Sequence, residues 1–130
     1  MSLESKAGSG RRLAYSNRLH HRREFLEFFS GSQVYRLRHC SVFRKANPLG
    51  HFRLGVTFKA KMSSVERNAL RRRIRETIRI LGPALGSFDY NIVVMKLQRP
   101  ALLFGRELAR EIQDGLLTQE PAESKAWRKK

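Results

Sequence analysis

The spacing of hydrophobic residues changes several times along the chain, and each change predicts a different element. Near the N-terminus, four apolar side chains recur at helical spacing in RREFLEFFSG, namely Phe25, Leu26, Phe28 and Phe29. Ser30 and Gly31 follow and favour a helix end. The pattern predicts a short first helix, and its spacing favours core positions for these apolar residues, most strongly for Phe28 with Leu26.

The next region changes to a strand-like pattern. Residues from Val34 to Lys45 mix β-branched and aromatic side chains with arginines, and Asn47–Gly50 (NPLG) supplies a turn before HFRLGVTF. This predicts a strand, a turn and another strand, and a break near Arg38 would divide the first run in two. Farther along, Ile92–Met95 is a short continuous apolar run, which is typical of a central strand covered on both faces.

Two longer helices are predicted around that central strand. Ser63 and Glu66 have the spacing of a capping box, so a helix should begin at Ser63 and end at Gly82-Pro83. After Pro100, apolar residues recur every four positions at Phe104, Leu108, Ile112 and Leu116, which predicts a last helix.

The order of elements is therefore helix, two or three strands, helix, strand, helix. This order predicts an α+β fold in which helices pack on one sheet. The length of 130 residues fits a single domain. Residues 1–16 are expected to be a disordered extension, 17–118 the domain and 119–130 a flexible basic tail.

The helix predicted after Ser63 is unusually rich in arginine. At about 100° per residue, one apolar stripe forms along it, made of Leu70, Ile74, Thr77, Ile78 and Leu81. The adjoining flank carries Arg67, Asn68, Arg71, Arg72, Arg75 and Arg79. Only Glu66 and Glu76 are available in the helix to neutralise this flank. Arginine suits phosphate oxygens and stacks on bases, so the flank predicts contact with nucleic acid rather than a solvated face.

The composition supports the same partner. The chain has 27 Lys and Arg against 11 Asp and Glu, a formal net charge of +16, which attracts polyanions. An anionic membrane surface is the second candidate, but no apolar run approaches the roughly 20 residues of a spanning helix. The N-terminus MSLESKAGSG lacks the pattern of a secretory signal. We therefore expect a soluble cytoplasmic protein that is not bound to membranes.

Signatures of protein-based catalysis are absent from the sequence. There is no glycine-rich phosphate loop, nucleophile elbow or H-E-x-x-H motif. The single cysteine, Cys40, lies in a strand-like run and is expected to be a small buried hydrophobe, and the four histidines show no metal-site spacing with it. The acids Glu107 and Glu111 are explained by pairing with arginines on the helix surface. No metal site or catalytic side chain is predicted.

Several aromatic residues are predicted to lie near the basic surface. Phe25 and Phe29 are one helical turn apart, and Phe43 alternates along a neighbouring strand. Aromatic faces beside basic residues hold single-stranded RNA without reading its sequence. Spacing alone favours the core for Phe25 and Phe29, so both interpretations stay open here.

Four segments together resemble the bacterial ribonuclease P protein component, the small basic subunit that accompanies a catalytic RNA. They are NRLHHRREFLEFF, VFRKANPLGHFRLGVTFKAK, ERNALRRRIRE and DYNIVVMKLQRPA, and they cover most of residues 17–100 in the family's order. The resemblance implies a four-stranded, mainly antiparallel sheet with a left-handed crossover from the third to the fourth strand through the arginine helix.

The resemblance also implies a function. The RNA subunit with Mg²⁺ would cleave precursor tRNA, while the protein would bind that RNA and the 5′ leader of the substrate. The arginine flank named above would contact the RNA subunit. The cleft between the first helix and the sheet would hold the leader, with the residues Arg18, Phe25, Phe29, Phe43, Thr57, Lys59 and Lys61. This shifts the interpretation of Phe25 and Phe29 towards a functional face.

The chain departs from the family pattern at several positions. Ala69 replaces the second arginine of the usual Arg-Asn-Arg, so one expected contact is missing and Arg71 or Arg73 would compensate. Ala60 stands where lysine is common, and the segment between Gly55 and Arg67 is one residue shorter than expected. The alternative function is a structural RNA-binding protein such as a ribosomal component, and a membrane-surface protein with a basic amphipathic helix is the third candidate.

Overall fold

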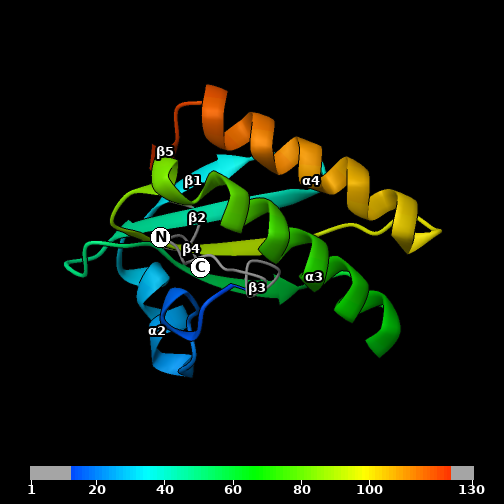
Figure 1. Cartoon of the computed structure of the whole chain (residues 1–130), viewed down its shortest axis with the longest axis horizontal. Helices are drawn as coiled ribbons and strands as arrows, with labels where there is room; N and C mark the ends of the chain where they lie inside the picture. The colour runs from blue at the N-terminus through cyan, green and yellow to red at the C-terminus, as the bar shows by residue number, and fades with distance from the viewer. Residues whose placement is uncertain (1–12, 124–130) are drawn as a thin grey trace, which may run out of the picture.

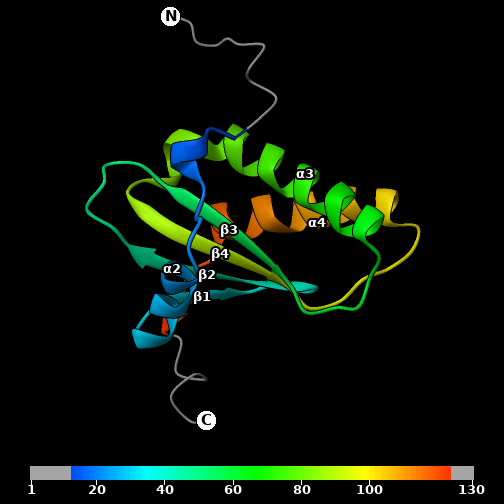
Figure 2. The same ribbon diagram turned by 90° about the horizontal axis from the view of Figure 1, so that it is seen from below.

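The computed structural model describes residues 13–123, in which one sheet has helices on both faces (Figures 1 and 2). In chain order the elements are η2 (Tyr15–Asn17), α2 (Arg22–Leu26), η3 (Glu27–Ser30), β1 (Gln33–Arg36), β2 (Cys40–Ala46), β3 (Arg53–Phe58), α3 (Ser64–Leu81), η4 (Gly82–Leu85), β4 (Phe88–Val94), α4 (Ala101–Thr118) and β5 (Ala122–Glu123). The predicted order of helices and strands is confirmed.

The strands are arranged in the order β3-β4-β2-β1-β5, with β3 and β4 parallel and every other neighbouring pair antiparallel. Figure 2 shows α3 and α4 on one face of the sheet and α2 on the other. In Figure 1 these two long helices lie in front, β3 and β4 run to the right, and β4 lies above β3. The β3-α3-β4 crossover is therefore left-handed, as the resemblance implied and against the general rule.

The ends of α3 form as their local sequence predicts. The Ser63 side chain accepts a hydrogen bond from the Glu66 amide at 3.1 Å, and the Ser63 amide donates to the Glu66 carboxylate at 2.9 Å. The helix ends at Leu81, and Gly82 and Pro83 turn the chain into η4. Because both signals are local, the sequence was sufficient to place this helix.

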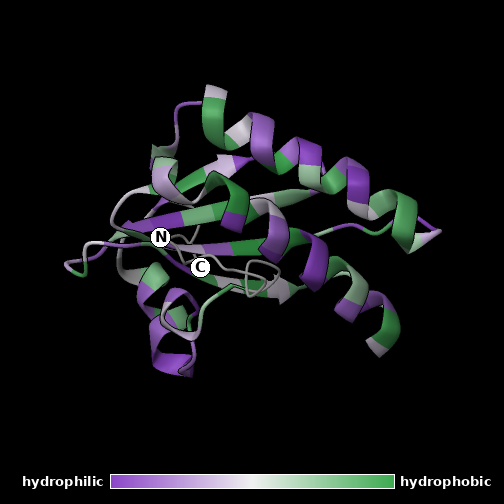
Figure 3. Cartoon of the chain, viewed as in Figure 1, coloured by the Kyte–Doolittle hydropathy of each residue, from purple (hydrophilic) through white to green (hydrophobic). Residues whose placement is uncertain are grey.

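The main core lies between the sheet and the two long helices. The predicted stripe of α3 is buried in full, and the α4 residues Phe104, Leu108 and Ile112 are buried opposite it. Ile92 and Val94 of β4 are completely buried below them. Truncating one of these aliphatic side chains to alanine would cost about 2–5 kcal/mol. Figure 3 shows hydrophobic and hydrophilic bands alternating along α3, as expected for a helix with one buried face.

A second, smaller core lies under α2 on the opposite face of the sheet. It consists of Leu19, Phe28, Val34, Phe43 and Val93, with Phe25 packed against it. The core position predicted for Phe28 is confirmed, whereas the core position predicted for Leu26 is wrong, since the exposed fraction of Leu26 is 45%. The helix is only five residues long before it tightens into η3, so it has one narrow buried side.

The break expected near Arg38 is confirmed, since it divides the first strand run into β1 and β2. Two other boundaries differ from the sequence analysis. Leu13, inside the predicted N-terminal extension, is buried in the main core, so ordered packing begins before residue 17. Ala122–Glu123, inside the predicted tail, pairs with β1 as a fifth strand that was not predicted. The rest of both predicted end segments, 1–12 and 124–130, lies outside the described residues.

Candidate nucleic-acid interface

The flank of α3 beside its buried stripe forms a basic surface that we call the arginine face. It consists of Arg67, Asn68, Arg71, Arg72, Arg75 and Arg79. Asn68 and Arg72 are exposed, and the other four are half-buried. Within residues 13–123, no arginine of this face forms an ion pair with a carboxylate. The face therefore keeps its positive charge.

Short-range contacts hold two of these arginines in place. Arg67 donates to the Met62 carbonyl at 3.0 Å and to the Ser64 hydroxyl at 3.2 Å. Arg71 donates to Asn68 Oδ1 at 3.0 Å, and its guanidinium lies 5.2 Å from the centre of the Phe58 ring. These partners are neutral, so they restrict the side chains without cancelling their charge. A ligand phosphate would meet partly ordered donors, which lowers the entropy lost on binding.

Neither acid of α3 pairs with the arginine face within residues 13–123. Glu66 caps the helix and also pairs with Arg99 at 2.7 Å, in the loop before α4. The hydrogen bond from the Ser63 backbone, followed by the contact with Arg99, lowers the pKa of the Glu66 carboxyl. Glu76 is exposed and forms no ion pair in the described part of the chain. The prediction that local pairing cannot neutralise this flank is thereby supported.

Arg18 joins the arginine face from a distant part of the sequence. It forms a β-bridge with Leu54 at the outer edge of β3, below α3. Burial, together with the positive charges of Arg18 and Arg71, lowers the pKa of Arg75. The Nε atoms of Arg18 and Arg79 are enclosed and have no hydrogen-bond partner. The resemblance assigned Arg18 to the leader-binding residues. Its positive charge, however, acts on Arg75 of α3, which is expected to bind the RNA subunit.

The opposite face of the sheet carries the predicted leader-binding residues, which we call the leader surface: Phe25, Phe29, Phe43, Thr57, Lys59 and Lys61. The aromatic residues differ in access, because Phe29 is 46% exposed whereas Phe43 is 8% exposed and belongs to the smaller core. Phe25 is half-buried, and its ring lies directly over Gly55, where a Cβ atom would collide with it. Phe29 therefore offers the largest aromatic face to a ligand.

The polar members of the leader surface lie along and beyond the end of β3. Thr57 is half-buried and donates to Asn91 on β4 at 3.1 Å. Lys59 and Lys61 follow the strand and are exposed. The Lys59 amide donates to the Val94 carbonyl at 2.9 Å, which extends the pairing of β3 with β4 and fixes the base of the lysine side chain. The arrangement combines aromatic and cationic groups, as in proteins that bind single-stranded RNA.

Two features of this region were missed from the sequence. Arg53 pairs with Glu24 of α2 and with Asp89 of β4, both at 2.7 Å, and so ties the first helix to the sheet. The hydrogen bond from Arg53 to Asp89 is the main reason why its pKa is raised. No local sequence pattern could have predicted ion pairs between residues so far apart in the chain. Asn91, the second feature, could have been noticed from the sequence, since it is a polar residue within an apolar strand.

Other predicted groups lie away from these surfaces. Cys40 is 1% exposed, and burial raises the pKa of its thiol, so the prediction of a small buried hydrophobe is confirmed. Glu111 pairs with His39 at 2.8 Å rather than with a surface arginine, which corrects the pairing expected for it. A polar hollow of about 490 Å³ lies beside this pair and has both arginines and acids in its lining, so it lacks the charge excess of the arginine face.

The described residues contain no cluster of three or more His, Cys, Asp or Glu side chains suited to a metal ion. In the same part of the chain, no helix is long and apolar enough to cross a membrane. The two candidate surfaces of residues 13–123 lie on opposite sides of one sheet.

Comparison with known proteins identifies the family. The model of the family described as Ribonuclease P matches residues 13–118 of the chain. The chain belongs to the ribonuclease P protein family. The match begins at Leu13, which is buried in the main core.

Individual ribonuclease P proteins agree with this assignment. The chain is 39% identical over 57 residues to the ribonuclease P protein component of Idiomarina loihiensis, covering 42% of this chain and 46% of that protein. It is 32% identical over 80 residues to the ribonuclease P protein component of an Exiguobacterium species, covering 61% of this chain and 70% of that protein. The matched segment thus spans less than half the length of the first relative.

A solved structure supports the fold. The RNase P protein from Thermotoga maritima, in complex with 1-(4-fluorophenyl)-2-thiourea, is similar with a TM-score of 0.63 and 28% identity. The alignment covers 77% of this chain and 94% of that one. The mixed, mostly antiparallel sheet and the helices packed on it are therefore the ribonuclease P protein fold, as the resemblance implied.

Proposed function

We propose that the chain is the protein subunit of ribonuclease P, which promotes endonucleolytic removal of the 5′ leader from precursor tRNA in the cytoplasm. The observation that carries this proposal is the arginine face, which no carboxylate neutralises within residues 13–123. Membership of the family supports a catalytic RNA as its partner. The arginines would lie against phosphates of that RNA and screen their repulsion as the complex forms.

The protein's side chains take no part in bond cleavage in this proposal. Phosphodiester hydrolysis belongs to the RNA subunit, with Mg²⁺ held mainly by RNA phosphates. The described part of the protein offers no acidic or histidine cluster for such an ion. The protein's contribution is to bind and orient two RNA molecules.

The leader of the precursor would lie as an extended single strand on the leader surface. Phe29 is exposed enough for a base to stack on it, and Lys59 and Lys61 are exposed to meet phosphates. Stacking of a base on an aromatic ring contributes about 1–3 kcal/mol. Arg18, near both surfaces, would contact the RNA where the leader approaches the RNA subunit.

Reconstitution tests the proposal most directly. The purified chain, added to a bacterial ribonuclease P RNA at low Mg²⁺, should restore leader removal from precursor tRNA, measured as the rate of appearance of mature 5′ ends. Failure to stimulate at every Mg²⁺ concentration would refute it. A ribosomal protein, the alternative, would instead co-sediment with a ribosomal subunit and ignore the leader.

A further inference from the structure

A small hollow lies between the outer surfaces of α3 and α4, beside the arginine face. The two helices are side by side in both views (Figures 1 and 2), and the ion pair of Glu66 with Arg99, at 2.7 Å, ties the start of α3 to the loop before α4. The volume of the hollow is about 160 Å³, and its lining consists of Ala69, Arg72, Arg73 and Glu76 of α3 with Ala101, Leu102 and Gly105 of α4. The sheet separates the hollow from the leader surface.

Small residues create the hollow. Gly105 is buried, and a Cβ atom added to it would lie 3.5 Å from the Leu70 side chain and 3.7 Å from that of Arg73, so the helices approach closely at this point. Ala69 and Ala101 are half-buried and leave the space beside them open. Leu102 provides an apolar wall and is 65% exposed. The hollow therefore presents apolar surface to the solvent.

The charged residues around the hollow are unpaired. Arg72 and Glu76 are exposed, Arg73 is half-buried, and within residues 13–123 none of the three forms an ion pair. An arginine that precedes an acid by one helical turn is the less favourable order for pairing on a helix surface. The Glu76 carboxylate therefore keeps free acceptor oxygens, and the guanidinium groups of Arg72 and Arg73 remain available to phosphates.

Size and chemistry limit what can enter the hollow. Pockets that enclose a whole small-molecule ligand usually measure about 300–1,000 Å³, so this smaller hollow would take only part of a larger molecule. A nucleobase matches it, because its flat faces pack on apolar side chains and guanidinium planes. The phosphates on either side of that base would meet Arg72 and Arg73. An apolar side chain of a protein partner would instead leave both arginines and Glu76 without partners.

The carboxylate of Glu76 favours one base. An ionised carboxylate only accepts hydrogen bonds. Guanine has two neighbouring donors on its pairing edge, N1–H and the 2-amino group, which match the two carboxylate oxygens. Adenine and cytosine place a ring acceptor beside their amino group, and uracil places a carbonyl on each side of its N–H. Each of these three bases would thus bring an acceptor close to a carboxylate oxygen, which is repulsive.

We propose that the hollow between α3 and α4 binds one unpaired guanine of the catalytic RNA, with Glu76 on its pairing edge and Arg72 and Arg73 on the neighbouring phosphates. This inference rests on the proposed function, since it takes the arginine face to lie against that RNA. It extends the RNA interface from α3 to the first turn of α4. It also gives the interface a base contact, whereas contacts to phosphates carry no sequence information.

The test uses the holoenzyme assembled from the full chain and its RNA subunit. Kethoxal, which modifies N1 and the 2-amino group of unpaired guanines, is applied to the RNA alone and to the holoenzyme. One guanine that reacts in the free RNA should be protected by the wild-type protein. The same guanine should react again when the protein carries Ala69→Leu, whose larger side chain fills the hollow, or Glu76→Gln.

The sign of the change in affinity separates this inference from general electrostatics. If Glu76 only repels phosphates, Glu76→Gln should tighten RNA binding, because it removes a negative charge. The inference predicts the opposite, a rise in the Kd of the RNA subunit of roughly 10- to 150-fold, the range for a lost hydrogen bond to a charged group. Changing the protected guanine to adenine should raise the Kd similarly, and Glu76→Gln should then add little, as expected for one coupled pair.

Glu107→Gln is the matched control. It removes another exposed carboxylate, which lies on α4 and outside the lining of the hollow. This variant should leave the affinity for the RNA subunit unchanged or slightly higher, and it should keep the guanine protected.

The outcomes are distinct. Unchanged or tighter binding by Glu76→Gln overturns the inference, as does a holoenzyme in which no protected guanine depends on Ala69 and Glu76, even if leader removal is normal. A wild-type chain that fails to assemble with the RNA subunit would refute the proposed function itself, and this inference with it. Thermal unfolding establishes that each variant is folded, and Glu76→Gln carries the test if Ala69→Leu fails to fold.

Discussion

The arginines of the protein differ in what they are free to do, although their side chains are chemically identical. Arg67 and Arg71 form hydrogen bonds with neutral partners, whereas Arg53 forms ion pairs with two carboxylates. Arg72 is exposed and has no partner in the described residues. An arginine already paired with carboxylates has little to offer a phosphate. In the proposed complex, the contribution of each arginine to RNA binding therefore depends on its neighbours.

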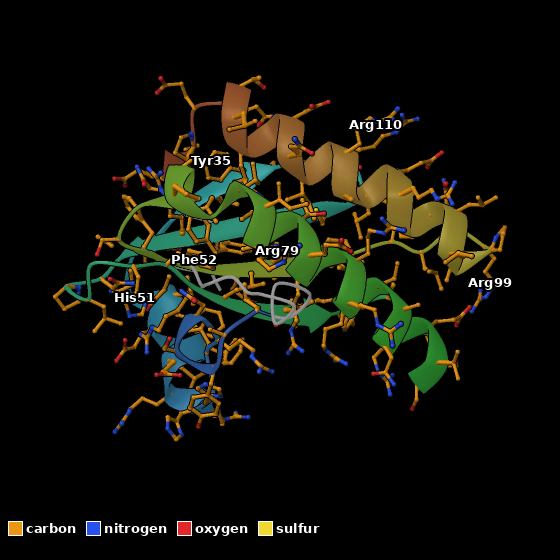
Figure 4. All side chains as sticks on the ribbon, viewed as in Figure 1. Tyr35, His51, Phe52, Arg79, Arg99 and Arg110 are labelled. Carbon is orange, nitrogen blue, oxygen red and sulfur yellow. The ribbon has the colours of Figure 1, made fainter. Side chains whose placement is uncertain are left out.

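Arg72→Ala should weaken assembly with the RNA subunit about tenfold, since one charge-assisted contact to a phosphate is lost. It should also make the salt dependence of binding shallower by about one ion. Arg110→Ala is the control: this exposed arginine projects from α4 away from α3 (Figure 4). Equal losses for the two variants, measured by filter binding or fluorescence titration, would contradict an interface on the arginine face.

Phe29→Ala should act on the substrate instead of on assembly. Removing the exposed ring should raise the Kd of precursor tRNA about 5- to 150-fold, because base stacking contributes roughly 1–3 kcal/mol. The Kd of mature tRNA and of the RNA subunit should change little. An equal effect on precursor and mature tRNA would show that the ring does not contact the leader.

Among the elements, α2 depends most on contacts outside itself. It is one short turn of helix that is too small to be stable alone. It is attached by the ring of Phe25, by the ring of Phe28 in the following η3, and by the pair of Glu24 with Arg53. The position of this helix, which borders the leader surface, is therefore set by the sheet.

The carboxyl of Glu24 links the attachment of α2 to pH. Burial alone would raise its pKa, but hydrogen bonds from the His21 and His20 amides and the charge of Arg53 outweigh burial and lower the pKa. A carboxyl whose pKa is lowered by folding stabilises the protein above its unfolded value, near pH 4, and this stabilisation is lost as the pH falls through the folded value.

Glu24→Gln should therefore destabilise the protein at pH 7 by about 1–2 kcal/mol, the size of a hydrogen bond to a charged group. The difference from wild type should shrink as the pH falls from about 4 towards 3. Urea unfolding at pH 7 and pH 3 measures both quantities. Glu107→Gln, at an exposed carboxyl with no ion pair in the described part, should show neither effect.

For the molecule as a whole, charge is the dominant property. The chain of 130 residues has a net charge of +16, and the sheet separates the arginine face from the leader surface. In the proposed function, two RNA strands would therefore bind on opposite sides without competing for the same side chains. The cost is self-repulsion in the free protein, which a bound polyanion relieves.

The affinity for the RNA subunit should fall steeply with salt. If about six phosphates are neutralised, the binding constant should drop roughly 10³-fold between 50 and 200 mM monovalent salt. A plot of log K against log salt concentration gives the number of ions released. A slope near zero would mean that the arginine face is not in contact with phosphates.

The elements were predictable because their signals are local. The capping box at Ser63, the Gly82-Pro83 stop and the apolar spacing of α3 each depend on residues within a few turns. The two surfaces were only partly predictable. Phe43 is largely buried, and Arg18 approaches α3 across the β3 edge, because side-chain access depends on what packs above it. Asn91 could have been noticed as polar in an apolar run, but its bond to Thr57 could not.

The sequence by itself determined the basic character of the protein, the buried stripe and charged flank of α3 and, through four ordered motifs, the family to which the chain belongs. Only the tertiary structure decided which charges remain unpaired, that Arg53 is occupied while the arginine face is not, and that Glu76 lies beside a hollow between α3 and α4. The reason is physical: charge and periodicity are properties of neighbouring residues, whereas burial and pairing are properties of residues brought together by folding.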